Sequence, residues 1–261
     1  MRIEDKFKKL REKGKKAFIA YVPFGYPSLQ YTKNILLTLQ EAGVDIIELG
    51  IPFSDPLADG PIIQDATTIA LKQGANTDKL FDVLDDLRGS LRIPLVIMTY
   101  YNPLLCYGMD RFFSKMKRTG ISGIMAVDLP IEESKPYLKS AARYDLETVF
   151  FVTPTTTLKR AKNIAKASRG FIYYISVTGI TGPKDLKYDV LKKDIKKIKE
   201  ISHLPVCVGF GIHTSKQITE IFKISDGAIV GSGIVKFIAD NFKEPQFFPR
   251  LKSFVSSLCT K

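Results

Sequence analysis

The segment "VDIIELGIPFSDPLADGPIIQDA", residues 44–66, combines an apolar run, a loop rich in Pro and Gly, and a run of helical periodicity. The apolar run, 44–50, has the aliphatic character of a parallel strand that is covered on both faces. Strand, loop and helix together predict one βα unit. The loop holds three prolines and is longer than such a connection needs, which is typical of lids and binding surfaces.

The same pattern recurs along the chain at intervals of roughly 25 to 45 residues. The strand candidates are 18–23, 44–50, 94–100, 123–129, 148–153, 171–176, 205–210 and 227–232. Eight βα units predict an α/β fold, a single (β/α)8 TIM barrel over residues 1–261. An open doubly wound sheet stays an alternative, although no linker or change of composition divides the chain.

The first sixteen residues, "MRIEDKFKKLREKGKK", form a basic amphipathic segment. Three acidic residues and no serine occur in it, unlike in a transit peptide. We therefore expect an extra N-terminal helix with Ile3, Phe7 and Leu10 facing inward. Start signals of later helices are also visible, since Ser28 and either Thr214 or Ser215 stand where capping residues are preferred.

The formal net charge of +12 admits either a nucleic-acid partner or a lysine-rich solvated surface. The densest basic run, "KKDIKKIKE" at 192–200, places Ile195 and Ile198 three apart, as in an amphipathic helix whose lysines face water. This spacing favours the surface interpretation. Because no basic groove with interleaved aromatic residues and no long apolar run is seen, we expect neither nucleic acid nor a membrane as partner.

Cysteine and histidine spacing argues against a metal site. Cys106, Cys207 and Cys259 form no CxxC pair, and His203 and His213 lie ten residues apart. The simplest location for such a chain is the reducing cytoplasm. None of the strand candidates contains a lysine that could form a Schiff base. Acid/base catalysis by carboxylates remains, with Tyr21, Tyr100 and Tyr173 near strand ends as further candidates, although a tyrosine there is more often a packing residue.

Two carboxylates stand where barrel enzymes carry their chemistry, at the carboxyl end of a strand and in the loop that follows. Glu48 lies near the end of the strand 44–50, and burial there would raise its pKa toward the range useful for proton transfer. Asp59 follows in the loop. The alternative is that Glu48 is a hydrogen-bonded barrel-layer carboxylate and the aspartates are turn residues, which is the favoured interpretation for Asp55 and Asp65.

Glycine pairs follow the last two strand candidates, in "VGFGI" at 208–212 and "VGSGI" at 230–234, and "SVTGITGP" at 176–183 follows the strand before them. Glycines in these loops let backbone amides approach a phosphate, with a helix N-terminus behind them. They predict a phosphorylated small molecule as ligand, while tight turns are the alternative. A dinucleotide-binding fingerprint is excluded, because Thr214 occupies the position of its third glycine.

Six motifs in this order, "ELGIPFSDPLADGPIIQDA", "YYNPLLCYG", "AVDLPIEES", "YYISVTGITG", "VGFGI" and "IVGSGIV", resemble the tryptophan synthase alpha chain family over nearly the whole chain. The resemblance implies a barrel lyase that cleaves indole-3-glycerol phosphate to indole and glyceraldehyde 3-phosphate in tryptophan biosynthesis. It further implies an α2β2 complex, in which the beta chain carries pyridoxal phosphate and receives the indole, while this chain needs no cofactor.

The resemblance assigns catalysis to Glu48 and Asp59. It assigns substrate contacts to Tyr21, Met98, Tyr100 and Tyr173 on the indole side, and to Thr181, Gly182, Gly211, Gly231 and Ser232 on the phosphate side. Loops 53–60 and 178–190 would be mobile covers, and 101–103 part of the face toward the beta chain. Two positions depart from the family pattern: Tyr26 stands where an aspartate is common, and Met98 replaces an aliphatic residue.

Two rival interpretations stay open. A sugar-phosphate isomerase would share the phosphate-binding glycines, but it leaves the long loop after 44–50 unexplained. The second interpretation is a barrel that has lost its activity and only activates a partner. The presence of both Glu48 and Asp59 argues against it.

Overall fold

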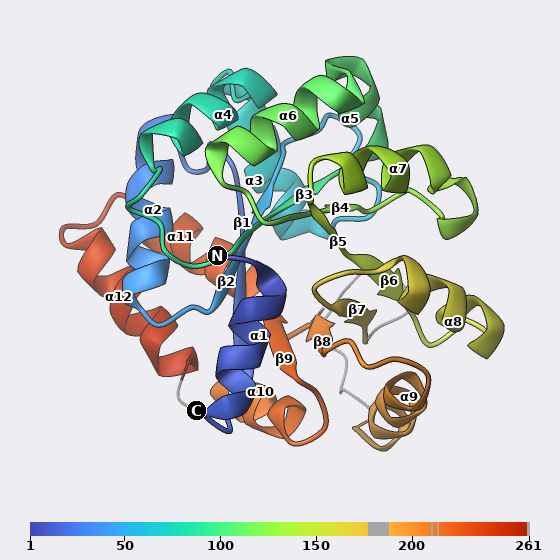
Figure 1. Ribbon diagram of the computed structural model, residues 1–261. Coiled ribbons are helices and arrows are strands. Elements are labelled where there is room, and N and C mark those ends of the chain that lie inside the picture. Colours follow the sequence, from blue (N-terminus) through green and yellow to red (C-terminus); the bar gives the residue numbers. More distant parts are fainter. Residues whose placement is uncertain (177–187, 210, 213, 260–261) are drawn as a thin grey trace.

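The computed structural model describes residues 1–176, 188–209, 211–212 and 214–259 (Figure 1). Its strands are β1 (Ala17–Pro23), β2 (Ile46–Gly50), β3 (Leu95–Thr99), β4 (Gly123–Ala126), β5 (Glu147–Thr148), β6 (Phe150–Val152), β7 (Ile172–Ile175), β8 (Val206–Gly209) and β9 (Gly227–Val230). Each of the eight predicted strand regions therefore contains a strand.

These strands form one parallel sheet in the order β5-β4-β3-β2-β1-β9-β8-β7-β6. Its two edge strands, β5 and β6, are separated in sequence by Val149 alone, so the sheet closes on itself at that residue. The predicted strand 148–153 is thus divided: Thr148 pairs with β4 and Phe150 pairs with β7. The described residues form the predicted TIM barrel, in which β5 and β6 together occupy one of eight strand positions around the ring.

Helices cover the outside of this barrel (Figure 1). They are α2 (Leu29–Glu41), α3 (Pro61–Lys72), α4 (Thr77–Asp86), α5 (Tyr101–Tyr107), α6 (Met109–Thr119), η1 (Ile131–Glu133), α7 (Lys135–Arg143), α8 (Leu158–Ala167), α9 (Tyr188–Ile201), α10 (Ser215–Phe222), α11 (Ser232–Asn241) and α12 (Phe247–Leu258). Helix α9 buries Leu191, Ile195 and Ile198, which confirms that the basic run is a solvated helix face. Thr214 caps α10 with a capping box, whereas Ser28 stands at the N-cap of α2 without a side-chain bond to its amides.

The predicted N-terminal helix is α1 (Ile3–Glu12), in blue in Figure 1. Its buried residues Ile3, Phe7 and Leu10 pack into one cluster with side chains from inside the barrel. The barrel residues of this cluster are Ala17, Ile19, Ile46, Val96, Met125, Val149, Phe171, Tyr173, Cys207 and Ile229. Many of them stand near the amino ends of their strands, so α1 plugs that end of the barrel.

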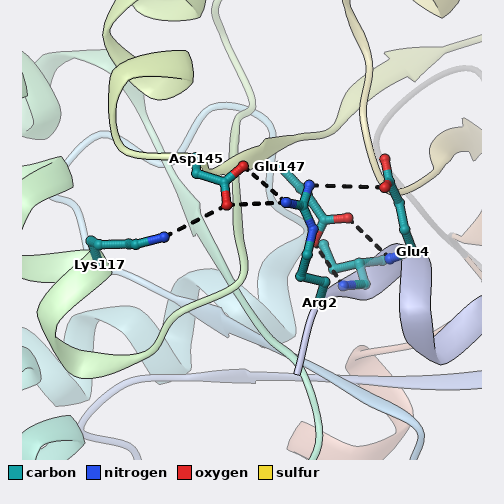
Figure 2. A network of polar contacts seen from close by, with 6 residues as sticks. Arg2, Glu4, Lys117, Asp145 and Glu147 are labelled. Atoms are coloured by element: carbon teal, nitrogen blue, oxygen red, sulfur yellow. Dashed lines mark hydrogen bonds and ion pairs between the residues drawn. The ribbon is translucent and has the colours of Figure 1, made fainter.

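A polar network fastens α1 in place (Figure 2). The buried carboxylate of Glu147 accepts hydrogen bonds from the backbone N–H groups of Ile3 (2.7 Å) and Glu4 (3.0 Å), which caps the helix from outside its own sequence. Arg2 pairs with Asp145 at 2.9 Å beside it. With this end of the barrel filled, the carboxyl ends of the strands are left for a ligand.

Candidate active site

A cavity of about 430 Å³ opens at the carboxyl ends of the strands. Eight of the predicted site residues line it: Tyr21, Glu48, Asp59, Met98, Tyr173, Gly211, Gly231 and Ser232, the last at the first position of α11. Further lining residues that sequence reasoning did not single out are Ile62, Ile63, Ile212, Ile229 and Lys236. Thr181 and Gly182 lie outside the described residues.

Glu48 is the central residue of β2, where its Cα is in register with Tyr21 of β1 and Val96 of β3. The residue is fully buried, and neither of its carboxylate oxygens has a hydrogen-bond partner among the described residues. Burial raises the pKa of Glu48 to about 8. The alternative of a hydrogen-bonded barrel-layer carboxylate therefore finds no support among the described residues. A buried carboxyl group with a raised pKa and no partner is typical of functional sites.

Asp59 reaches the cavity from the end of the long loop, directly before Gly60 and α3. Its Oδ2 accepts a 2.9 Å hydrogen bond from the hydroxyl of Tyr100, and its backbone carbonyl accepts one of 2.8 Å from the side chain of Gln64. Burial raises the pKa of Asp59, and the bond from Tyr100 acts in the opposite direction. The carboxylate is therefore held in one orientation at the rim of the cavity.

Tyr100 stands behind Asp59 and is absent from the residues that line the main cavity. Its hydroxyl also accepts a 3.0 Å bond from the backbone N–H of Ala58, and its ring packs on Phe53 with centroids 5.3 Å apart. The predicted role of Tyr100 as an indole contact stays untested, and the geometry adds a second one: it anchors the loop that carries Asp59.

Two buried tyrosines, Tyr21 of β1 and Tyr173 of β7, line the cavity together with Glu48. A Cβ atom at Gly50 would overlap the hydroxyl of Tyr21, and one at Gly209 would overlap that of Tyr173. Gly209, which the sequence pattern groups with the phosphate-binding glycines, is thus required to make room for a tyrosine side chain. No feature of the sequence indicated this, because the two residues of each pair lie on neighbouring strands.

The part of the cavity wall formed by Gly211 and the start of α11 has the features of an anion site. Gly211 adopts a left-handed backbone with φ +73°, which favours glycine, and Gly231 is the N-cap of α11. The N-terminal amides of α11 therefore stand at the cavity wall, together with the side chain of Ser232. Backbone amides at a helix N-terminus bind anions through hydrogen bonds and the helix dipole.

The model of the family described as "Tryptophan synthase alpha chain" matches residues 7–257. The chain belongs to this family. It is 39% identical over 257 residues to the tryptophan synthase alpha chain of Geotalea uraniireducens, with 98% of this chain and 96% of that one covered. The alpha chain of Thermoanaerobacter sp. strain X514 is 40% identical over 258 residues and covers 98% of both chains. A crystal structure of tryptophan synthase subunit alpha from Legionella pneumophila superposes with a TM-score of 0.92 at 31% identity, over 99% of this chain and 97% of that one.

This tryptophan synthase alpha chain family member has a second cavity of about 310 Å³ beside the first. Met98 and Tyr173 line both cavities, and the second is walled mainly by apolar residues that include Val127, Phe151 and Ile175. An aromatic ring that rests on Met98 and Tyr173 would therefore meet apolar surface on the side away from the anion site.

Tyr26, the departure from the family pattern, is buried in the main core. Burial raises its pKa, and Asp240 of α11 and Asp65 of α3 raise it further. The side chain therefore lies close to two helices that border the cavity.

The part of the chain that the structure describes contains no group of three or more His, Cys, Asp or Glu side chains placed to hold a metal ion. Within the same residues, no helix combines the length and the apolar character that a membrane crossing requires.

Proposed function

We propose that this chain cleaves indole-3-glycerol phosphate to indole and glyceraldehyde 3-phosphate, as the alpha subunit of a tryptophan synthase. The observation that carries the proposal is that one cavity is lined both by Glu48, a buried carboxyl group without a partner among the described residues, and by Gly231 and Ser232 at the N-terminus of α11. A phosphate at the N-terminus of α11 anchors the substrate, and the glycerol carbons then extend toward Glu48.

The indole ring occupies the apolar side of the cavity, against Met98, Tyr21 and Tyr173. On the phosphate side Gly211, Gly231 and Ser232 supply the contacts, with Thr181 and Gly182 as further contacts that the family resemblance implies. Apolar walls with a few fixed polar groups are typical of small-molecule sites.

Glu48 moves the proton. With a pKa of about 8 the carboxyl group is mostly protonated at neutral pH, so it donates its proton to C3 of the indole ring first. The resulting carboxylate then accepts the proton of the glycerol hydroxyl next to the scissile bond. As that hydroxyl becomes an aldehyde, the carbon–carbon bond to C3 breaks and its electron pair returns to the ring. The proton given to C3 and the proton taken from the hydroxyl balance.

Asp59 stabilises the charge that this protonation creates. The ring N–H becomes acidic when C3 is protonated, and an ionised carboxylate that accepts its hydrogen bond offsets the positive charge. The protonated ring serves as the electron sink, so the chain's own residues suffice without a Schiff base. Tyr100 keeps Asp59 in position through its 2.9 Å bond.

A beta chain is the proposed partner, since the family works with one. The stoichiometry α2β2, the pyridoxal phosphate of the beta chain and a cytoplasmic location belong to the same proposal. Two strongly exposed apolar residues on the side of the cavity mouth support a docking face there: Leu57, 84% exposed, lies two residues before Asp59, and Leu105, 50% exposed, lies on α5 after the segment 101–103. Docking on Leu57 would act directly on the Asp59 loop.

The test is indole release from indole-3-glycerol phosphate by the purified chain, alone and with a beta chain added. We expect slow release alone and faster release in the complex. Glu48→Gln and Asp59→Asn should each reduce turnover by about 10²-fold to 10⁴-fold. Near-normal turnover in either variant would remove that residue from the mechanism, and phosphate binding without any indole release would favour a sugar-phosphate isomerase.

A further inference from the structure

Lys236 is the only lysine or arginine among the described residues that line the main cavity. It lies on α11, one helical turn after Ser232. The sequence patterns that pointed to Glu48, Asp59 and the glycine loops did not include Lys236. A cation at the wall of a cavity that ends in an anion site calls for an explanation beyond a solvated helix face.

Helix geometry allows the Lys236 side chain to reach the anion site. Residues four apart on a helix are separated by about 6 Å along its axis, and their side chains share one face. Helical side chains lean toward the N-terminus, so a lysine at this position covers the turn that begins at Ser232. Its flexible stem then brings Nζ within reach of an anion held by the first amides of α11.

In this structure the Nζ of Lys236 is turned the other way, to Oδ2 of Asp240 at 3.2 Å. Both side chains are largely exposed, at 64% and 55%, so this ion pair contributes little to stability and is easily exchanged for another. Asp240 thus holds the ammonium group one turn away from the anion site without binding it tightly.

We propose that Lys236 binds the phosphate group of the substrate, leaving Asp240 when the phosphate arrives. The inference rests on the proposed function, because it deepens the substrate site described above. Backbone amides and the Ser232 hydroxyl are neutral donors, whereas an ammonium group forms a charge-assisted hydrogen bond with a phosphate oxygen. Asp240 competes with the phosphate for the same cation.

Three variants separate this role from that of a surface lysine. Lys236→Met removes the charge and keeps the length of the stem. Asp240→Asn removes the competitor and keeps its shape. Lys223→Met, at the C-cap of α10, is the matched control, since Lys223 also pairs with a carboxylate of the helix beside it, Glu220 at 2.6 Å, and is 62% exposed, but it lines neither cavity.

We expect Lys236→Met to raise KM for indole-3-glycerol phosphate by about 10-fold or more at little changed kcat. Asp240→Asn should act in the opposite direction and lower KM by roughly twofold to fivefold, and the control should leave both constants unchanged. A KM for Lys236→Met within about twofold of the unmodified chain overturns the proposal. So does an increase of KM in Asp240→Asn, because a purely structural ion pair would suffer equally from the loss of either partner.

A phosphorus NMR titration with inorganic phosphate makes the result independent of catalysis. Weaker phosphate binding by Lys236→Met, with binding by Lys223→Met unchanged, supports the role of Lys236 even if the chain released no indole and the proposed function failed. Equal phosphate binding by the unmodified chain, Lys236→Met and Lys223→Met rejects Lys236 as a phosphate ligand even where indole release is normal.

Discussion

The hydroxyl of Tyr100 stands between the backbone of Ala58 and the carboxylate of Asp59, accepting a 3.0 Å hydrogen bond from the first and donating one of 2.9 Å to the second. Tyr100 is also the N-cap residue of α5. One hydroxyl therefore joins the loop that carries Asp59 to the helix that carries the exposed Leu105. A movement of Tyr100 at the start of α5 would reach the carboxylate through this hydroxyl.

Removing that hydroxyl should lower catalysis and leave the fold intact. Tyr100→Phe keeps the ring on Phe53 and deletes the bond that lowers the pKa of Asp59, so this pKa should rise. We expect kcat to fall about 10-fold and the ascending limb of its pH profile to move to higher pH. Tyr174→Phe is the control, because it deletes a Tyr–Asp bond of the same 2.9 Å length, to Asp194, outside the residues that line the cavities. Equal losses in both variants would contradict the prediction.

The raised pKa of Glu48 predicts the other limb of the pH profile. Protonated Glu48 is the donor to indole C3, and this form is lost as pH rises through about 8. The ratio kcat/KM, which reports the free enzyme, should therefore be steady near neutrality and fall about tenfold per pH unit above that value. A ratio that rises through the same range would show that the chain needs the ionised carboxylate at the start of the reaction.

The same burial makes folding stability depend on pH. The pKa of Glu48 is raised from 4.5 in the unfolded chain to about 8 in the folded one, so its favourable contribution is complete below the first value and is lost as pH rises through the second. Glu48→Gln cannot ionise. We expect its free energy of unfolding to exceed that of the unmodified chain by a few kcal/mol at pH 9, and by much less at pH 4. Denaturant unfolding measures this, with the exposed Glu12→Gln as control; a pH-independent difference would contradict the assignment.

Much of the barrel could be predicted because its signals are local. Short apolar runs located every strand region, and the segments of helical periodicity between them indicated helices. The spacing of Ile195 and Ile198 identified the buried face of α9 and hence its solvated one. The division of one predicted strand at Val149 was missed because it depends on which neighbour each half pairs with. Ser28 was a correct N-cap position without the expected bond, since a suitable residue type does not fix where its side chain points.

The candidate site divides in the same way. Glu48 and Asp59 were recognisable from their residue type and from their positions in a predicted strand and in the long loop after it, and the structure brings both to one cavity. The supporting contacts were not recognisable. Tyr100 holds Asp59, and Gly209 makes room for Tyr173, through contacts between elements that are far apart in sequence or on neighbouring strands. Lys236 reaches the cavity wall only because of the direction of its side chain.

Tyr26 offers a test of how the core tolerates the family's more common residue. Tyr26→Asp would bury a carboxyl group near Asp65 and Asp240, which raises the pKa of the new group and opposes its ionisation. We expect a loss of about 2–4 kcal/mol in the free energy of unfolding at pH 8 and a smaller loss at pH 5. Tyr26→Phe should cost less than about 1 kcal/mol. If both variants unfold at the same denaturant concentration, the core around Tyr26 accommodates a charge.

Gly209 should tolerate no side chain, because Tyr173 occupies the space where a Cβ atom would stand. Gly209→Ala forces the ring toward the cavity or the backbone of β8 outward, and overpacking of this kind lowers the free energy of unfolding by about 1–3 kcal/mol. We expect KM to rise as the ring moves into the substrate's space. Adding Tyr173→Leu removes the overlapping atoms and should restore part of the stability but not the activity, which makes the two changes strongly non-additive. Additive losses in unfolding and kinetic measurements would mean that Gly209 has another role, such as an amide that contacts the phosphate.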